Sequence, residues 1–177
     1  MTKVYATVAD RSAGDPILES DWDNYIKTNI NNLIVPPVCV VYNSSDLLIP
    51  NNAFTDLTFN SESIDTDGMH STSTNTNRIT INTTGIYVMS LVGSFAADAT
   101  GIRTLAIFVD GSDYLCAADI PANSVGGCTV SLTSPPIQLT SGQYVNAQAY
   151  QTSGGTLALT ANTMSPYFSA HFVGRVS

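Results

Sequence analysis

Histidines, serines and carboxylates are the residues of this chain that could support catalysis. The two histidines, His70 and His171, lie far apart in the sequence, so they cannot form the His-x-His pair with which one strand presents two metal ligands. A hydrolase needs a nucleophile beside an oriented base, but no Gly-x-Ser-x-Gly turn surrounds any of the many serines. Neither histidine has a recognisable partner pattern. We therefore expect a protein that is not an enzyme and has no catalytic residues.

The carboxylates whose spacing most resembles a catalytic or metal site are Glu62, Asp65 and Asp67, in a long polar stretch. A glycosidase would need two carboxylates in a cleft, whereas these lie in a predicted solvated turn. The motif DTDG (65–68) resembles part of a calcium loop, but the alternating acidic ligands and the distal glutamate are missing. We expect no metal and no cofactor.

Three cysteines, Cys39, Cys116 and Cys128, occur at unrelated spacings and without a Cys-x-x-Cys pair. This odd number favours buried, reduced thiols over a disulfide framework. A bridge between Cys116 and Cys128 stays open as an alternative.

The charge of the chain excludes some classes of partner. The net charge is −8, with only six lysines and arginines, and charged residues make up 11% of the sequence. Binding to nucleic acid depends on clustered lysine and arginine, so neither nucleic acid nor an anionic membrane surface is expected. No apolar run approaches the roughly 20 residues of a membrane span, and the start MTKVYATVAD lacks the features of a signal peptide. We expect synthesis in a cytoplasm.

One stretch near the start of the chain has helical periodicity. Apolar residues recur at every fourth position, and two more widen the same stripe: Leu18, Trp22, Ile26, Ile30 and Ile34, with Tyr25 and Leu33. Ser20 and Asp23 predict a capping box, and Pro36-Pro37 predicts the end of the helix. The stripe could pack on the chain's own strands, on sister helices or on another protein. We favour an intermolecular contact because the two prolines separate the helix from the rest.

After the prolines, the pattern is that of strands and turns. Short β-branched or alternating runs are separated by turn signals, among them Thr84-Gly85, Asp110-Gly111 and Ser141-Gly142. About nine such runs and the lack of strand–helix alternation predict an all-β fold, an antiparallel sandwich or barrel. The expected organisation is an arm and one short amphipathic α-helix over residues 1–36 and a β domain over 37–177.

Four segments of the β domain carry a family resemblance. RITINTTGIYVMSLVGSF, LAIFVDGSDY, IQLTSGQYVNAQAY and PYFSAHFVGRV resemble, in this order, the globular-head jelly roll of complement first-component and tumour-necrosis-factor-like proteins. The matching motifs are Gly85-Ile86-Tyr87, Asp110-Gly111 and the segment 139–145, which departs at Gln143, where an acidic residue is usual. The resemblance implies a TNF-like jelly-roll sandwich and a compact homotrimer. Tyr87, Phe108, Tyr150 and Phe172 are our candidates for its core or subunit interface.

The helical segment resembles a different group of proteins. AGDPILESDWDNYIKTNINNL (13–33) is similar to the segment that begins many tailed-bacteriophage virion structural proteins, with Lys27-Thr28 in place of an Arg-Asp pair. In that group the segment joins a C-terminal surface domain to the particle. The resemblance implies that the helix attaches this chain to a virion. The candidate attachment residues are Leu18, Trp22, Tyr25, Ile26, Ile30 and Leu33.

Two functional hypotheses follow. The first is a phage virion surface protein, made in the bacterial host cytoplasm, that decorates the capsid as a trimeric cement or head-fibre protein. The second is a tail-tip knob that binds a host receptor or glycan through loop residues such as Asn75, Asn77, Tyr114 and Asn123. The only tryptophan lies in the helix, so the sequence indicates no aromatic platform on which a sugar could stack. We favour capsid decoration because the chain contains no long stalk.

Overall fold

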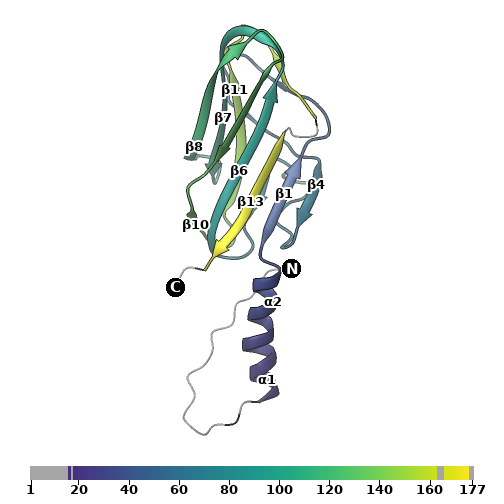
Figure 1. Cartoon of the computed structure of the whole chain (residues 1–177), viewed down its shortest axis with the longest axis vertical. Helices are drawn as coiled ribbons and strands as arrows, with labels where there is room; N and C mark the ends of the chain where they lie inside the picture. The colour runs from purple at the N-terminus through teal and green to yellow at the C-terminus, as the bar shows by residue number, and fades with distance from the viewer. Residues whose placement is uncertain (1–15, 17, 163–165, 176–177) are drawn as a thin grey trace.

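The computed structural model describes residues 16, 18–162 and 166–175, which form a short helix and a two-layered β sandwich (Figure 1). The helix consists of α1 (Glu19–Asp21), the π-helical segment η1 (Trp22–Lys27) and α2 (Thr28–Ile34). The strands are β1 (Val38–Tyr42), β2 (Leu47–Ile49), β3 (Thr55–Asp56), β4 (Ser61–Asp65), β5 (Arg78–Thr80), β6 (Gly85–Phe95), β7 (Asp98–Val109), β8 (Asp113–Asn123), β9 (Cys128–Thr133), β10 (Ile137–Leu139), β11 (Tyr144–Gln151), β12 (Leu157–Leu159) and β13 (Tyr167–Gly174). The prediction of an all-β antiparallel sandwich preceded by one short helix is confirmed.

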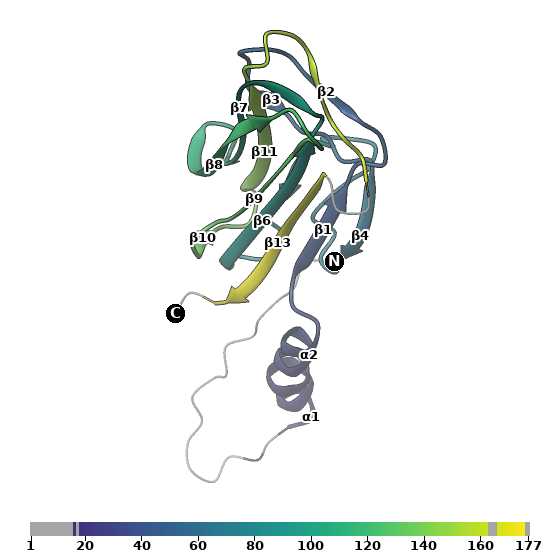
Figure 2. The ribbon, with the colours of Figure 1, turned by 45° about the horizontal axis from the view of Figure 1, so that its top comes forward.

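The strands form two sheets that face each other (Figure 2). The larger sheet has the order β2-β12-β6-β13-β1-β4, with β9 and β10 also paired to β6. The smaller sheet has the order β3-β11-β7-β8, with β5 also paired to β11. We call them the large sheet and the small sheet. All the pairings between named strands are antiparallel, and β13 at the end of the chain lies between β6 and β1.

The alternation of side chains along the strands builds the core. In β6 every second residue is buried, and Tyr87, Met89, Leu91 and Phe95 point between the sheets. From the small sheet, β11 contributes its own inward residues at the same spacing of two. Because successive side chains of a strand point to opposite faces, this register also decides which residues form the two outer surfaces.

Two local expectations need correction. The polar stretch that was expected to be only a turn contains β4, which pairs with β1. The helix begins two residues earlier than the capping pattern predicts: Leu18 is its N-cap, and the Asp21 carboxylate accepts the Leu18 N–H at 2.9 Å. Asp21 can do this because the third helical residue reaches back to the cap, and Ser20 is already inside the helix.

The π-helical segment explains the spacing of the apolar stripe. A spacing of four residues exceeds the 3.6 residues of an α-helical turn, so such a stripe drifts around a pure α-helix. A π turn holds more residues, because its hydrogen bonds run to i+5. A stripe with a spacing of four drifts in one direction around the α-helical segments α1 and α2, and in the opposite direction around the π-helical segment η1. The two drifts offset each other. The stripe therefore stays on one side.

The tight turn between β7 and β8 is built as the sequence predicts, with φ of 51° at Asp110 and 76° at Gly111. The Asp110 carboxylate accepts the Tyr144 N–H at 3.0 Å and the Gln143 Nε2–H at 2.9 Å. The departure from the usual acidic residue therefore has a physical reason. A second carboxylate at position 143 would meet Asp110 with like charge, whereas the amide donates a hydrogen bond to it.

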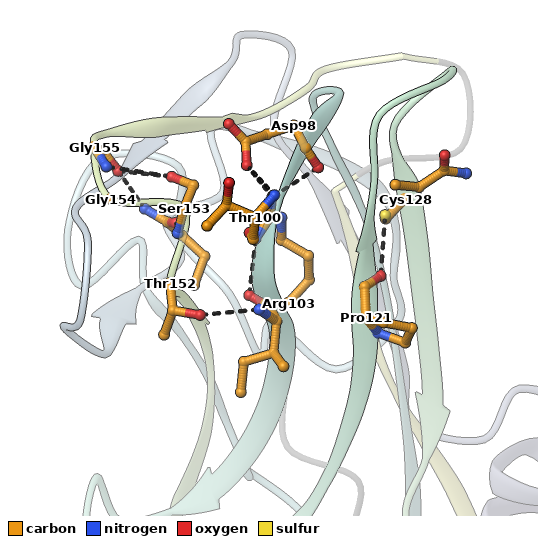
Figure 3. A network of polar contacts seen from close by, with 12 residues as sticks. Asp98, Thr100, Arg103, Pro121, Cys128, Thr152, Ser153, Gly154 and Gly155 are labelled. Carbon is orange, nitrogen blue, oxygen red and sulfur yellow. Dashed lines mark hydrogen bonds and ion pairs between the residues drawn. The ribbon is translucent and has the colours of Figure 1, made fainter.

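A buried arginine holds the start of β7 (Figure 3). Arg103 is fully buried, and one guanidinium nitrogen donates to the carbonyls of Thr100 at 2.9 Å and Ile102 at 3.0 Å. The other donates to the Asp98 carboxylate at 3.1 Å and to the Asp98 carbonyl at 3.3 Å. The chain turns tightly here, with Gly101 at φ +79° against the backbone of Thr152. The guanidinium thus ties together three carbonyls of this turn, those of Asp98, Thr100 and Ile102.

We expect Arg103→Met to destabilise the fold by about 3 kcal/mol, because removing one partner of a buried ion pair leaves the remaining polar groups unsatisfied. The melting temperature should fall by roughly 6–12 °C, measured by thermal denaturation of the purified protein. Thr100→Ala is the control, because Arg103 contacts only the carbonyl of that residue. A change of less than about 2 °C in the arginine variant would contradict this role.

Candidate interaction surfaces

The first candidate surface is the apolar stripe of the helix. The exposed fractions of Leu18, Trp22, Ile30, Leu33 and Ile34 are 53%, 55%, 47%, 77% and 71%. Ile26 is half-buried, and the side chain of Tyr25 lies outside the described residues. Both views show the helix beyond the end of the sandwich, below the start of β1 and the end of β13, rather than packed along either sheet (Figures 1 and 2). Most of the described stripe is therefore exposed to solvent.

A cleft of about 470 Å³ lies where the helix meets the sandwich. Leu33 and Pro36 line it from the helix side, and Phe172 and Val173 line it from β13. Val173 is 61% exposed, so apolar surface continues from the stripe onto the end of the large sheet. The cleft thus joins the helix surface to the end of the large sheet, with Asn29 and Arg175 also in its lining.

The second candidate surface is the outer face of the large sheet. Residues paired across the strands share this face, in rows such as Val38/His171/Val88, Val40/Ser169/Ser90/Thr133 and Tyr42/Tyr167/Val92/Ser131. With their neighbours they form what we call the uncharged face: Val38, Val40, Tyr42, Ile64, Ile86, Val88, Ser90, Val92, Ser94, Thr129, Ser131, Thr133, Tyr167, Ser169 and His171. None of these is Lys, Arg, Asp or Glu. The rings of Tyr42 and Tyr167 stack where β1 ends and β13 begins, with centroids 5.2 Å apart.

The third candidate surface is an aromatic cluster on the outer face of the small sheet. Phe54 stacks on Tyr150 with a centroid distance of 4.9 Å and meets Phe108 edge to face at 6.3 Å. Tyr114 meets Phe108 at 5.3 Å, also edge to face. We call these four residues the aromatic platform. Sequence reasoning missed it because the four rings come from four different segments.

The four predicted core or interface residues separate into two pairs. Tyr87 is fully buried, donates its hydroxyl to the Thr83 carbonyl at 2.6 Å and contacts the ring of Phe172. These two belong to the core. Phe108 and Tyr150 belong to the aromatic platform, which lies on the opposite side of the sandwich from the uncharged face. Whether any of the four contacts another subunit stays a prediction.

The predicted loop residues of a knob do not form one site. Asn77 donates to the Asp56 carboxylate at 2.9 Å, and Tyr114 belongs to the aromatic platform. Asn123 lies at the other end of β8 from Tyr114 and accepts the Val125 N–H. Asn75 is a turn residue with φ of 51°. Only Tyr114 of this group lies in an interaction surface.

The DTDG loop uses its carboxylates for structure. Asp65 accepts the N–H groups of Asp67, Met69 and His70 at 3.0–3.2 Å, and buried Asp67 accepts the Thr83 hydroxyl at 2.7 Å. The ring of His70 contacts the Glu62 carboxylate at 2.9 Å, while His171 is exposed on the uncharged face. Within residues 18–162 and 166–175, no group of three or more His, Cys, Asp and Glu could hold a metal ion.

The cysteines are free thiols. Burial raises the pKa of the Cys39 thiol far above its ordinary value, and the nearby carboxylates of Asp65 and Glu62 raise it further. Burial also raises the pKa of Cys116. Cys128 donates its thiol to the Pro121 carbonyl at 3.5 Å (Figure 3). Because the thiolate is the nucleophile and the metal ligand, a raised pKa makes Cys39 and Cys116 less reactive than an ordinary thiol.

The shape of the chain matches solved jelly rolls. No family model matches the sequence, and neither does the sequence of any curated protein. Murine APRIL at pH 5.0 superposes with a TM-score of 0.60 and 10% identity, over 77% of this chain and 98% of that one. Eiger TNF from S. frugiperda gives 0.58 and 11%, over 80% and 96%. The globular domain of zebrafish complement 1qA gives 0.52 and 14%, over 79% and 98%.

The fold is a TNF/C1q-like jelly roll. At 10–14% identity this likeness concerns the fold, and it confirms the fold that the order of the four sequence segments implied. In the part of the chain with described structure, no helix has the length and apolar character to span a membrane.

We expect chelation to leave the stability unchanged. Adding EDTA should not lower the melting temperature, because N–H and hydroxyl donors already occupy the carboxylates of Asp65 and Asp67. The measurement is thermal denaturation with EDTA and with added Ca²⁺. A fall of many degrees with EDTA that Ca²⁺ restores would show a cation at this loop or between subunits.

Proposed function

We propose that this chain is a homotrimeric structural protein of a bacteriophage virion surface, attached to the capsid through its N-terminal segment as a decoration protein. It is not an enzyme in this proposal. The observation that carries the proposal is the apolar stripe, which lies on a helix beyond the sandwich and whose described side chains are mostly exposed. An isolated helix of this length is marginal in water unless its apolar side is buried. A partner surface therefore belongs to the folded state.

The uncharged face supports the trimer. The solvated face of an antiparallel sheet normally carries charged and strongly polar residues. The outer face of the large sheet instead presents valine, isoleucine, tyrosine, serine and threonine. Charged residues are depleted in the cores of subunit interfaces, and aromatic residues are enriched there. An obligate interface usually buries about 2,000 Å² or more, and a whole sheet face can supply such an area.

The position of the helix connects the two surfaces. The helix leads directly into β1, which belongs to the uncharged face, and the cleft by Leu33 and Val173 joins both regions. Three chains that meet through this face would place their helices at the same end of the assembly. The stripes can then contact sister helices, the virion or both.

The virion assignment rests on the resemblance of residues 13–33 to the segment that begins many phage structural proteins. The low content of charged residues, and the many polar side chains that form hydrogen bonds within the domain, suit a rigid exterior domain. A tail-tip knob is the alternative location. Immunogold electron microscopy of the particle distinguishes the two, because label over the head supports decoration and label at the tail tip supports a knob.

We expect the purified protein to have three times the 18.7 kDa mass of one chain in light scattering at micromolar concentration. Ser90→Lys should reduce this to one chain mass, since Ser90 lies in the middle of the uncharged face and a lysine there would be buried without a partner. Ser124→Lys, in the exposed loop after β8, is the matched control and should stay trimeric. A wild-type mass near one chain would refute the trimer.

We expect Trp22→Ala and Ile26→Ala to weaken particle attachment or the trimer while the sandwich stays folded. Trp22 is 55% exposed, so its removal takes little from the stability of a single chain. Truncating an aromatic that a partner buries costs about 3–5 kcal/mol, or more than a hundredfold in affinity. The measurements are co-sedimentation with particles and the melting temperature, with Lys27→Ala as the control on an exposed polar residue of the helix.

Deletion of residues 1–36 gives the sharper test of the helix. A soluble β-rich remnant that no longer binds particles is the expected result. An unfolded or insoluble remnant would mean that the helix belongs to the core of the sandwich, and the attachment role would then be wrong.

A further inference from the structure

The aromatic platform has the features of a saccharide site, and we propose that it binds a neutral glycan chain. This goes beyond the proposed function and does not depend on where on a virion the protein lies. Of the four rings, Phe54 is 52% and Tyr114 is 61% exposed, although both lie among strands with a large buried core. Exposed rings that contact one another on a rigid sheet mark a surface for recognition.

The platform is held in place by the strands beneath it, and two of its ring pairs meet edge to face. Phe108 on β7 and Tyr114 on β8 are paired across the strands, and Tyr150 lies two rows away on β11. The row between them carries Ala106, which points outward but is 0% exposed, and its partner Ala117. These small side chains leave room for Phe54, which contacts both Tyr150 and Phe108. The exposed rings of Phe54 and Tyr114 can each accept the C–H face of a pyranose ring.

Hydrogen-bonding groups around the platform are held in position. The Asp56 carboxylate accepts amide N–H groups from Asn77, Asn146 and Gln148 at 2.9–3.0 Å. Asn52 accepts the Tyr150 hydroxyl at 3.2 Å. Because Gln148 donates through its nitrogen, the orientation of its amide is fixed, and its carbonyl oxygen points away from Asp56. Carboxylate and amide groups fixed beside an aromatic ring are the partners that sugar hydroxyls require.

The charge of this surface selects the class of glycan. Asp56 and Asp119 are exposed on the outer face of the small sheet, and the whole chain has a net charge of −8. Arg78 on β5 pairs with Asn146, which in turn pairs with Phe108 of the platform. Its guanidinium lies over the ring of Tyr144, 4.6 Å from the centroid. Uronic acids, sialic acids and phosphate-bearing sugars would meet repulsion here. A neutral glycan, rich in hydroxyl donors, is the fitting ligand.

In the proposed trimer the three platforms would be on the outside, because the small sheet faces away from the uncharged face. Three weak sites on one rigid assembly bind a repeating polysaccharide more tightly than one site does. The large sheet would hold the subunits together, and the small sheet would remain free for a ligand.

The test uses the labelled full-length protein on an array of neutral and acidic oligosaccharides, followed by titration of the best neutral binder. Phe54→Ala should raise the dissociation constant at least about tenfold, the loss expected when an aromatic contact is removed. Tyr114→Ala should weaken binding as well, and Tyr114→Phe should retain it because the ring stays. Leu48→Ala is the matched control, since Leu48 is 68% exposed on β2. The melting temperature of each variant checks its folding.

Selective binding of neutral sugars that the two alanine variants lose confirms the proposal. Binding of none of the neutral sugars overturns it, as does binding of acidic sugars alone or unchanged affinity in both alanine variants. A smaller mass for Phe54→Ala in light scattering would show instead that the platform is a contact between subunits. The failures to bind sugars would leave the trimer untouched, because its test depends on Ser90 on the opposite sheet, whereas the smaller mass would move a subunit contact to the small sheet.

Discussion

The antiparallel pairing of β6 with β13 is the contact on which the rest of the structure depends. It joins the middle of the chain to its end, and β13 then pairs with β1, so three distant segments form the centre of the large sheet. The register of this pairing fixes which residues face inward. Phe168, Ala170 and Phe172 meet the core, and the residues between them reach the uncharged face. Since the side-chain period of a strand is two, a slip of one residue would exchange the two sets.

The two outer surfaces of the sandwich differ because their strands carry different outward residues. The large sheet presents aliphatic, hydroxyl and tyrosine side chains, and the small sheet presents rings surrounded by amides and carboxylates. A jelly roll needs only its inner residues to fold, so its outer faces are free to acquire separate roles. This division allows one domain to be a subunit contact on one side and a ligand surface on the other.

Carboxylates in this protein work mainly as acceptors for nearby N–H groups. Asp56, Asp65 and Asp110 each accept two or more hydrogen bonds. Arg103 is instead a donor, to carbonyls at the start of β7. Each of these bonds satisfies a backbone or side-chain polar group, most of them in loops and turns. With 11% charged residues, the chain thus uses a small number of charges to order its loops.

The sequence by itself determined the features that depend on neighbours along the chain. Alternation in 85–95, the Asp110-Gly111 turn and the stripe from Leu18 to Ile34 all follow from local geometry, and the order of motifs was enough to predict the jelly roll. Tertiary structure alone decided which surface each residue joins. Phe54, Phe108, Tyr114 and Tyr150 form one platform, and Tyr87 with Phe172 lies in the core, because strand pairing brings together residues that no sequence spacing relates. The same holds for Asp65, whose carboxylate was a candidate metal ligand in the sequence and is an acceptor for three backbone N–H groups in the folded loop.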